Sequence, residues 1–484
     1  MMTKNILKAV FSCFICMLLL FGCAPNSQTD ITPDFNTFAP TFPPTPEPSP
    51  QQTQNIADEA MGFQNFPFPN DTELQLNKDK TQVIFTRQQA FKDYYILWEI
   101  LVENCPVIDA AKDIKGIDWQ NIKSRYEDIL SARIGTDNII TQNEFFDFIM
   151  VCLLEFQHIG HINAVPYSLY ESYLSFLDKP DASEYEKNQL ALLESEKVKN
   201  LYSYFASEQN QKYNATEKMP EPSMSSEDVE DLLFENGIFD YSEIEGVPYV
   251  KVRSCLSPGT DEGDALINLL HETFAESKDA KNIIIDMQGN DGGATRAWIE
   301  GIVIPLLGEA LPPYYILCGV KSGALNQYFW GGVNPPTDES AETMDAILKI
   351  FPSLKEEILS EFDAFSIQRN SISHSNVGFE GNIWVLVDDG TYSAADQFAI
   401  FCKRTGFATL VGTETGGNGA GSTPYMFALP NSGLLVRYEA FYAFNDDGTC
   451  NAIVGTKPDI EAKEGQTALE ACLEQIQNGI SGNT

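Results

Sequence analysis

Ser393 and a glycine-rich turn are the residues of this 484-residue sequence whose types and spacing most suggest chemistry. Ser393 lies in "DDGTYSAADQFAIF", between a strand predicted over 382–389 and a helix predicted to begin near Ala394. A serine hydroxyl becomes a nucleophile when a base takes its proton. A serine before a helix is also explained by N-capping, and Ser393-x-x-Asp396 is close to a capping box. From this stretch alone the cap is the simpler interpretation, although strand, turn, serine and helix also make a nucleophile elbow.

Two further kinds of residue could complete a catalytic site. The strand-like run "NIIIDM" leads into Gly292 and Gly293, where backbone N–H groups could approach a substrate carbonyl, although an ordinary tight turn explains the pattern too. A serine nucleophile also needs a base. The candidates are His158, His161, His271 and His374. Taken singly, each histidine is explained by a structural role.

The elements before these motifs are predicted to be helical. Apolar side chains recur with helical spacing along two stretches between residues 81 and 166. They are Phe91, Tyr94, Trp98, Leu101 and Cys105 in the first stretch, and Trp119, Ile122, Tyr126 and Ile129 in the second. A third helix is predicted to begin at the capping box Thr141-x-x-Glu144. We expect one N-terminal helical bundle over 81–166, followed by a charged helical insertion over 167–235.

Residues 236–475 are predicted to form an α/β core. The run "GVPYVKVRSC" alternates like a strand, and buried strands are indicated by "NIIIDM", "NIWVLVDD" and "ATLVG". Helices are indicated by "LINLLHETFAES" and "AADQFAIFCKRTG". Strands that alternate with helices favour a largely parallel sheet. No internal repeat is visible.

The motifs, in this order, resemble the tail-specific, or C-terminal-processing, serine peptidase family, which includes the tricorn core protease. The resemblance covers roughly residues 85 to 465, and the shared order is more specific than any single motif. The motifs are Gly160-His161, Asp286 with Asn290-Asp291-Gly292-Gly293, Ser393-Ala394-Ala395-Asp396, Gly412-Thr413-Glu414-Thr415-Gly416-Gly417 and Gly455-Thr456-Lys457-Pro458-Asp459-Ile460. The resemblance implies a crotonase/Clp-protease-like core of strands and helices and a peptidase that requires no metal or cofactor.

The resemblance also implies roles for individual residues. Ser393 would be the nucleophile, and the oxyanion would be held by the N–H of Ala394 and one from Gly292 or Gly293. The tricorn-like branch takes its base from a Gly-His pair at the end of the helical unit, which implies His161 as the base.

Three departures from the family pattern are visible. The processing branch uses a lysine base, and the matching position here is Asn418, which cannot act as a general base. The acidic residue expected shortly before Gly455 is missing, and Glu439, Asp446 and Asp447 are unranked candidates for an orienting carboxylate. No peptide-binding PDZ module is recognisable, and the insertion occupies its place.

The first 22 residues are predicted to be a signal peptide. Lys4 and Lys8 precede an apolar run that is short for a membrane span. Leu20-Phe21-Gly22-Cys23 resembles the bacterial lipoprotein box, which implies cleavage before Cys23 and lipidation of its thiol. Residues 23–80 then form a lipidated, proline-rich tether. We expect a protein anchored to the cell membrane by lipid, outside the cytoplasm; an uncleaved anchor or a plain secreted protein remains open.

Charge and cysteine content argue against two classes of function, nucleic-acid binding and zinc binding. The net charge of −38 makes binding to nucleic acid unfavourable. Seven cysteines follow Cys23 without a CxxC pair, which argues against a zinc site and favours buried thiols.

The predicted function is that of an extracytoplasmic serine peptidase that hydrolyses peptide or protein substrates through an acyl-enzyme on Ser393, with His161 as general base. The alternative is a catalytically inactive, peptide-binding lipoprotein of the same fold. A solute-binding lipoprotein with two similar lobes is a second rival.

Overall fold

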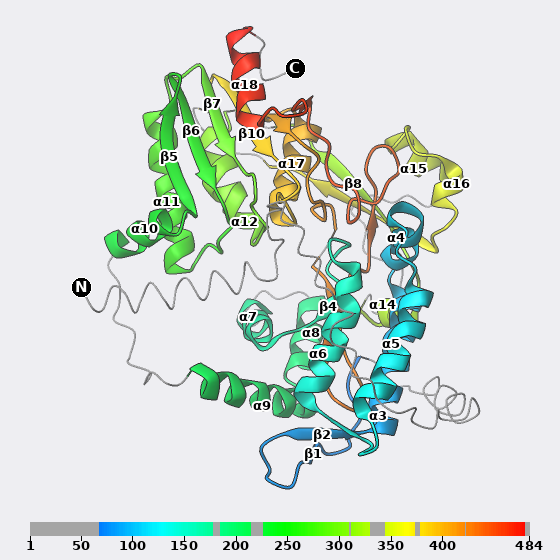
Figure 1. Ribbon diagram of the computed structural model, residues 1–484. Coiled ribbons are helices and arrows are strands. Elements are labelled where there is room, and N and C mark those ends of the chain that lie inside the picture. The colour runs from blue at the N-terminus through cyan, green and yellow to red at the C-terminus, as the bar shows by residue number, and fades with distance from the viewer. Residues whose placement is uncertain are drawn as a thin grey trace.

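The computed structural model describes residues 67–177, 184–213, 226–308, 311–329, 344–372, 378–421 and 423–479. The predicted signal peptide, Cys23, most of the tether and His374 lie outside these residues. The main sheet has six strands and lies in the upper part of the view in Figure 1, and most of the blue and cyan N-terminal helices lie below it.

The six-stranded sheet confirms the predicted α/β class. Its strands, in spatial order, are β15 (Ile460–Glu461), β11 (Thr409–Gly412), β10 (Asn382–Val387), β7 (Asn282–Asp286), β6 (Val247–Val252) and β5 (Phe239–Ile244). The strands from β15 to β6 pair in parallel, and only β5 joins antiparallel. The predicted strands at β6, β7, β10 and β11 are all present.

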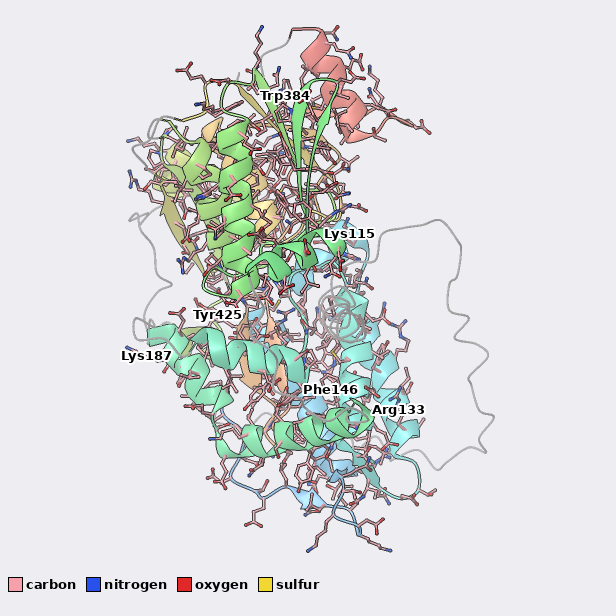
Figure 2. All side chains as sticks on the ribbon, turned by 90° about the vertical axis from the view of Figure 1, so that its left-hand side faces the viewer. Lys115, Arg133, Phe146, Lys187, Trp384 and Tyr425 are labelled. Atoms are coloured by element: carbon pink, nitrogen blue, oxygen red, sulfur yellow. The ribbon has the colours of Figure 1, made fainter. Side chains whose placement is uncertain are left out.

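Alternating side chains of the sheet enter two apolar clusters, because successive residues of a strand face opposite sides. In β10, Ile383, Val385 and Val387 belong to the main core, whereas Trp384 and Leu386 belong to a smaller cluster on the other face. Helix α18 (Ala468–Gln477) covers the smaller cluster. The main-core face carries α11 (Asp261–Glu276), α12 (Thr295–Trp298) and α17 (Ala394–Thr405). Figure 2 labels Trp384 among the strands at the top.

The N-terminal helices are α3 (Arg87–Asn104), α4 (Val107–Lys115), α5 (Trp119–Ile134) and α6 (Gln142–Leu153), continued by the 3-10 turn η2 (Leu154–Phe156). The capping box of Thr141 and Glu144 is confirmed at the start of α6. Ile129 was predicted to face the core but is 36% exposed, because the buried stripe of α5 runs through Ile122, Tyr126 and Leu130 instead.

The region predicted to be a helical insertion contains α7 (Tyr167–Leu177), α8 (Glu184–Leu193), α9 (Glu196–Tyr213) and α10 (Ser226–Glu235). Tyr202 of α9 and Leu192 of α8 are buried in the same core cluster as Phe91 of α3 and Val385 of β10. One apolar core therefore runs from the N-terminal helices to the sheet.

The remaining elements form three small sheets and short helices. The sheets are β1 (Gln75–Leu76), β2 (Val83–Thr86) and β3 (Ile139–Thr141); β12 (Tyr425–Ala428), β13 (Leu435–Tyr438) and β4 (Asn163–Ala164); and β14 (Tyr442–Ala443), β8 (Tyr314–Val320) and β9 (Ala364–Asn370). The helices are the π-helix η3 (Ile299–Val303), α13 (Ile304–Leu306), α14 (Ala324–Phe329), α15 (Met344–Ile350) and α16 (Glu356–Leu359). The pairing of β13 with β4 matters for the site, because it joins residues 435–438 to the chain just after His161.

Candidate active site

Ser393 immediately precedes α17, after the turn that follows β10. Its backbone has φ 55° and ψ −120°, a conformation that residues other than glycine rarely adopt and that costs about 1–3 kcal/mol. Its N–H donates to the Gly417 carbonyl at 2.9 Å. The hydroxyl makes no capping hydrogen bond. Ser393 therefore occupies the predicted N-cap position, but its side chain does not cap the helix, and its backbone is not the extended one usual for an N-cap residue.

Asp396, the expected partner in that capping box, anchors a different segment. Its buried carboxylate accepts hydrogen bonds from Thr415 Oγ1 at 2.5 Å, from the Gly419 N–H at 2.9 Å and from Asn451 Nδ2 at 3.0 Å. Burial raises the pKa of Asp396, and these hydrogen bonds oppose the shift. Asp396 thus fixes the loop of residues 413–420, hereafter the anchor loop, against the first turn of α17.

The glycine turn after β7 packs directly against Ser393. A Cβ on Gly292, which has φ 101°, would lie 2.8 Å from Ser393 Cβ and 2.9 Å from the Ala394 nitrogen. The Gly292 N–H already donates to Asn290 Oδ1 at 2.9 Å. Within the described part of the chain, the N–H groups of Gly293 and Ala394 have no hydrogen-bond acceptor. Of the predicted oxyanion donors, these two are the ones left free.

His161 follows Gly160, at the end of the N-terminal helical region. Its ring centroid lies 5.6 Å from that of Tyr392, the residue before Ser393, and the Tyr392 hydroxyl donates to the Gly160 carbonyl at 3.1 Å. The structure therefore brings the predicted base next to the nucleophile segment. Within the described residues, no hydrogen bond joins the side chain of His161 to that of Ser393. Burial lowers the pKa of His161 well below its usual value, and the charge of Arg437 adds to this effect.

Asn418 and Glu439 lie behind the histidine, on its Nδ1 side. Asn418 Nδ2 is in hydrogen-bond contact with Nδ1, and Glu439 Oε2 lies 3.8 Å from the same nitrogen. Glu439 is 1% exposed, and burial raises the pKa of its carboxyl to about 8. The sequence named Glu439 as one of three unranked carboxylates. Glu439 lies near His161 because it follows β13, which pairs with β4, and no sequence signal shows that pairing.

The other candidates lie elsewhere. Asp446 pairs with Arg404 at 3.4 Å, and Asp447 pairs with Lys457 at 3.0 Å, both at the surface. His271 Nε2 is 2.8 Å from the Glu300 carbonyl oxygen, as expected for a residue that packs on a helix surface. His158 is close to the site in sequence, but it is His161 that contacts the Tyr392 ring.

Metal ligands and membrane helices were also sought in the described residues. No three histidine, cysteine or acidic side chains there are arranged to hold a metal ion. In the same part of the chain, no helix combines the length and apolar character needed to cross a membrane. The seven described cysteines are all free and buried, as predicted.

Comparison with protein families gives a match within the core. Residues 246–462 match peptidase family S41. The S41 match spans the sheet from β6 to β15 and includes Ser393, the glycine turn, Asn418 and Glu439. It covers less than half of the chain, and His161 lies outside it. The match supports the peptidase family that the motifs resemble.

Solved structures of low identity resemble the chain over most of its length. A candidate peptidase from Parabacteroides merdae is 20% identical, covers 81% of this chain and 97% of its own, and has a TM-score of 0.44. A lipoprotein from Streptococcus agalactiae is 12% identical, with coverages of 85% and 98% and a TM-score of 0.40. Mature CPAF in complex with lactacystin is 12% identical, with coverages of 81% and 97% and a TM-score of 0.42. Scores this low carry no argument about the reaction. None of the curated proteins compared with the chain matches it.

Proposed function

We propose that this protein is a serine peptidase in which Ser393 is the nucleophile and His161 is the general base. The observation that carries the proposal is the backbone of Ser393. Ser393 has a strained φ of 55°, and its hydroxyl makes no capping hydrogen bond. The N–H groups of Ala394 and Gly293, which have no acceptor among the described residues, belong to the same turn region. The S41 match supports the same reaction, because peptidases of that family are serine hydrolases.

The reaction would proceed by acyl transfer. His161 Nε2 takes the proton of the Ser393 hydroxyl as its oxygen attacks the peptide carbonyl. The N–H groups of Ala394 and Gly293 donate to the oxyanion, and the imidazolium then protonates the leaving amine. Water attacks the acyl-enzyme by the reverse sequence, which releases the new carboxylate and restores Ser393. Glu439 is the described carboxyl group closest to His161 and would orient the ring.

The proposed setting is outside the cytoplasm, with the folded part tethered by a lipid on Cys23. It rests on the sequence from Lys4 to Cys23 alone. Peptides or proteins that reach the outer side of the cell membrane would be the substrates.

Hydrolysis of an unfolded protein such as casein tests the proposed activity. We expect new α-amino groups to accumulate with the wild-type chain, and S393A and H161Q to lower the rate at least about a hundredfold, because triad members act as a unit. S360A, at an exposed serine, is the control and should match wild type. Equal rates for S393A and wild type would exclude Ser393 as the nucleophile. A folded wild type without activity would favour the inactive, peptide-binding alternative.

A further inference from the structure

Buried polar atoms without hydrogen-bond partners are concentrated behind His161. They include Asn418 Oδ1 and both carboxyl oxygens of Glu439. A buried polar atom that lacks a partner costs about 1–3 kcal/mol. These three atoms lie beside His161, and the orientation of the Asn418 amide decides which of them can find a partner.

The orientation of the Asn418 amide determines which ring nitrogen of His161 carries the proton. In the structure, Asn418 Nδ2 faces His161 Nδ1, so the amide donates and Nδ1 must be the unprotonated nitrogen. The ring proton of neutral His161 is then on Nε2. A histidine in that tautomer has no lone pair on Nε2 and cannot take a proton there.

A half-turn of the amide reverses this arrangement without changing the shape of the side chain. Asn418 Oδ1 then accepts the Nδ1–H of His161, which leaves the Nε2 lone pair free for the Ser393 proton. Glu439 also contacts the amide. Burial raises the pKa of its carboxyl group to about 8, so the group carries a proton at any pH below that value. Its O–H can donate to the same carbonyl oxygen, which gives partners to two of the three unsatisfied atoms.

We propose that Asn418 is a positioning residue whose amide selects the productive tautomer of His161. This inference rests on the proposed function. The backbone supports it, because the Asn418 N–H donates to the Asn451 carbonyl at 2.9 Å and the neighbouring Gly417 carbonyl accepts from Ser393. The anchor loop thus holds the nucleophile and the amide together. The other charged group that acts on His161 is Arg437 of β13.

Two variants separate the amide's role from the fold. N418G removes the amide at φ 64°, a backbone conformation that suits glycine, so the chain should still fold. In N418D, the ionised carboxylate has no donor and can only accept a hydrogen bond from His161 Nδ1–H. This variant therefore keeps the productive tautomer, with the proton on Nδ1. The matched control is N138G, which makes the same change at an exposed asparagine with φ 55°.

Activity and ring ¹⁵N chemical shifts of His161 are the readouts, with H161Q identifying the signal. We expect N418G to lower kcat at least about tenfold with little change in KM, and to move the ring proton toward Nε2. N418D should restore kcat, hold the proton on Nδ1 and raise the pKa of His161, because it adds a negative charge. N138G should match wild type.

The outcomes distinguish this inference from the proposed function. If S393A abolishes hydrolysis while N418G keeps wild-type kcat and wild-type ring shifts, the positioning role is wrong and the peptidase stands. If the wild type hydrolyses no substrate, the ring ¹⁵N shifts of His161 still test whether Asn418 selects the tautomer. An unchanged tautomer in both N418G and N418D would overturn the inference without reference to activity.

Discussion

Arg437 and burial together hold His161 in the neutral state that a general base needs. Burial is the larger cause of the lowered pKa of His161, and the positive charge of Arg437 is the second. Arg437 is itself held by hydrogen bonds from its Nε to Asn163 at 2.6 Å and from Nη1 to the Tyr173 hydroxyl at 3.3 Å. A base whose pKa lies below 6.5 remains unprotonated, and hence competent, at neutral pH.

The acid limb of kcat/KM should therefore lie below pH 6.5 in the wild-type protein. Removing the charge in R437Q should raise the pKa of His161, so that protonation inactivates the variant at a higher pH than wild type. R437K keeps the charge and should keep the limb in place. A pH–rate profile of the three proteins makes the comparison. An identical acid limb in R437Q would mean that Arg437 does not act on the base.

At the residue scale, the sequence identified those candidate site residues that lie within a short, recognisable motif. Ser393 and His161 each lie in a short recognisable motif, and the structure places their segments together. Glu439 could not be ranked, because its place near His161 depends on β13 pairing with a strand more than 270 residues earlier. The side-chain cap expected at Ser393 is absent. Residue types alone do not reveal the positive φ of Ser393, so the sequence could not exclude that cap.

The glycine turn and the start of α17 form one unit in which Gly292 allows close approach. A Cβ at Gly292 would also lie 2.8 Å from the Tyr392 carbonyl oxygen, a distance that real Cβ atoms essentially never show. We expect G292A to shift the turn or the helix start. It should lower stability by about 1–3 kcal/mol and slow acylation of Ser393 at least about tenfold.

G259A is the matched control for that variant. Gly259 has φ 91°, and a Cβ there would meet no atom within 4 Å, so only the backbone penalty of about 1 kcal/mol remains. Thermal unfolding and the rate of acylation should be measured on both proteins. Equal acylation rates in G292A and G259A would contradict the close-approach role of Gly292.

At the element scale, periodicity found the elements with strong patterns and missed those stabilised by distant partners. The strands β7, β10 and β11 are largely continuous apolar runs, which mark buried parallel strands, and β6 shows the alternation of a strand. The edge strand β5 is mostly exposed, and β8, β9, β12 and β13 pair in small sheets whose patterns are short. Helix α4 was missed because its apolar stripe is brief, with three buried residues.

At the scale of the whole molecule, the candidate site joins two parts of the chain through one core. His161 lies between η2 and β4, at the end of the N-terminal helices, and Ser393 lies between β10 of the sheet and α17. Figure 1 shows where these labelled elements lie. The S41 match includes only the second part. The six strands follow one another across the sheet in sequence order, from β5 at one edge to β15 at the other. His161 lies before all of them in the chain, so its place beside the Ser393 segment could be inferred only from family resemblance.

The lipid anchor is a prediction about the whole molecule that the described residues leave untested. In a bacterial host, metabolic labelling with a fatty acid should place the label on the wild-type chain and bring it into the membrane fraction. C23S should lose the label and leave that fraction, because one residue carries the attachment. C255S, at a buried cysteine, is the control and should remain labelled. Wild-type protein without label would exclude the anchor.

The most direct measurement of the central claim is covalent labelling by a fluorophosphonate, followed by mass mapping of the adduct. The Ser393 oxygen should attack phosphorus and expel fluoride, so the account predicts one adduct per chain, located on Ser393. H161Q should slow its formation, because the base is lost. An adduct on another residue, or an unlabelled but folded wild-type protein, would contradict the claim that Ser393 is an activated nucleophile.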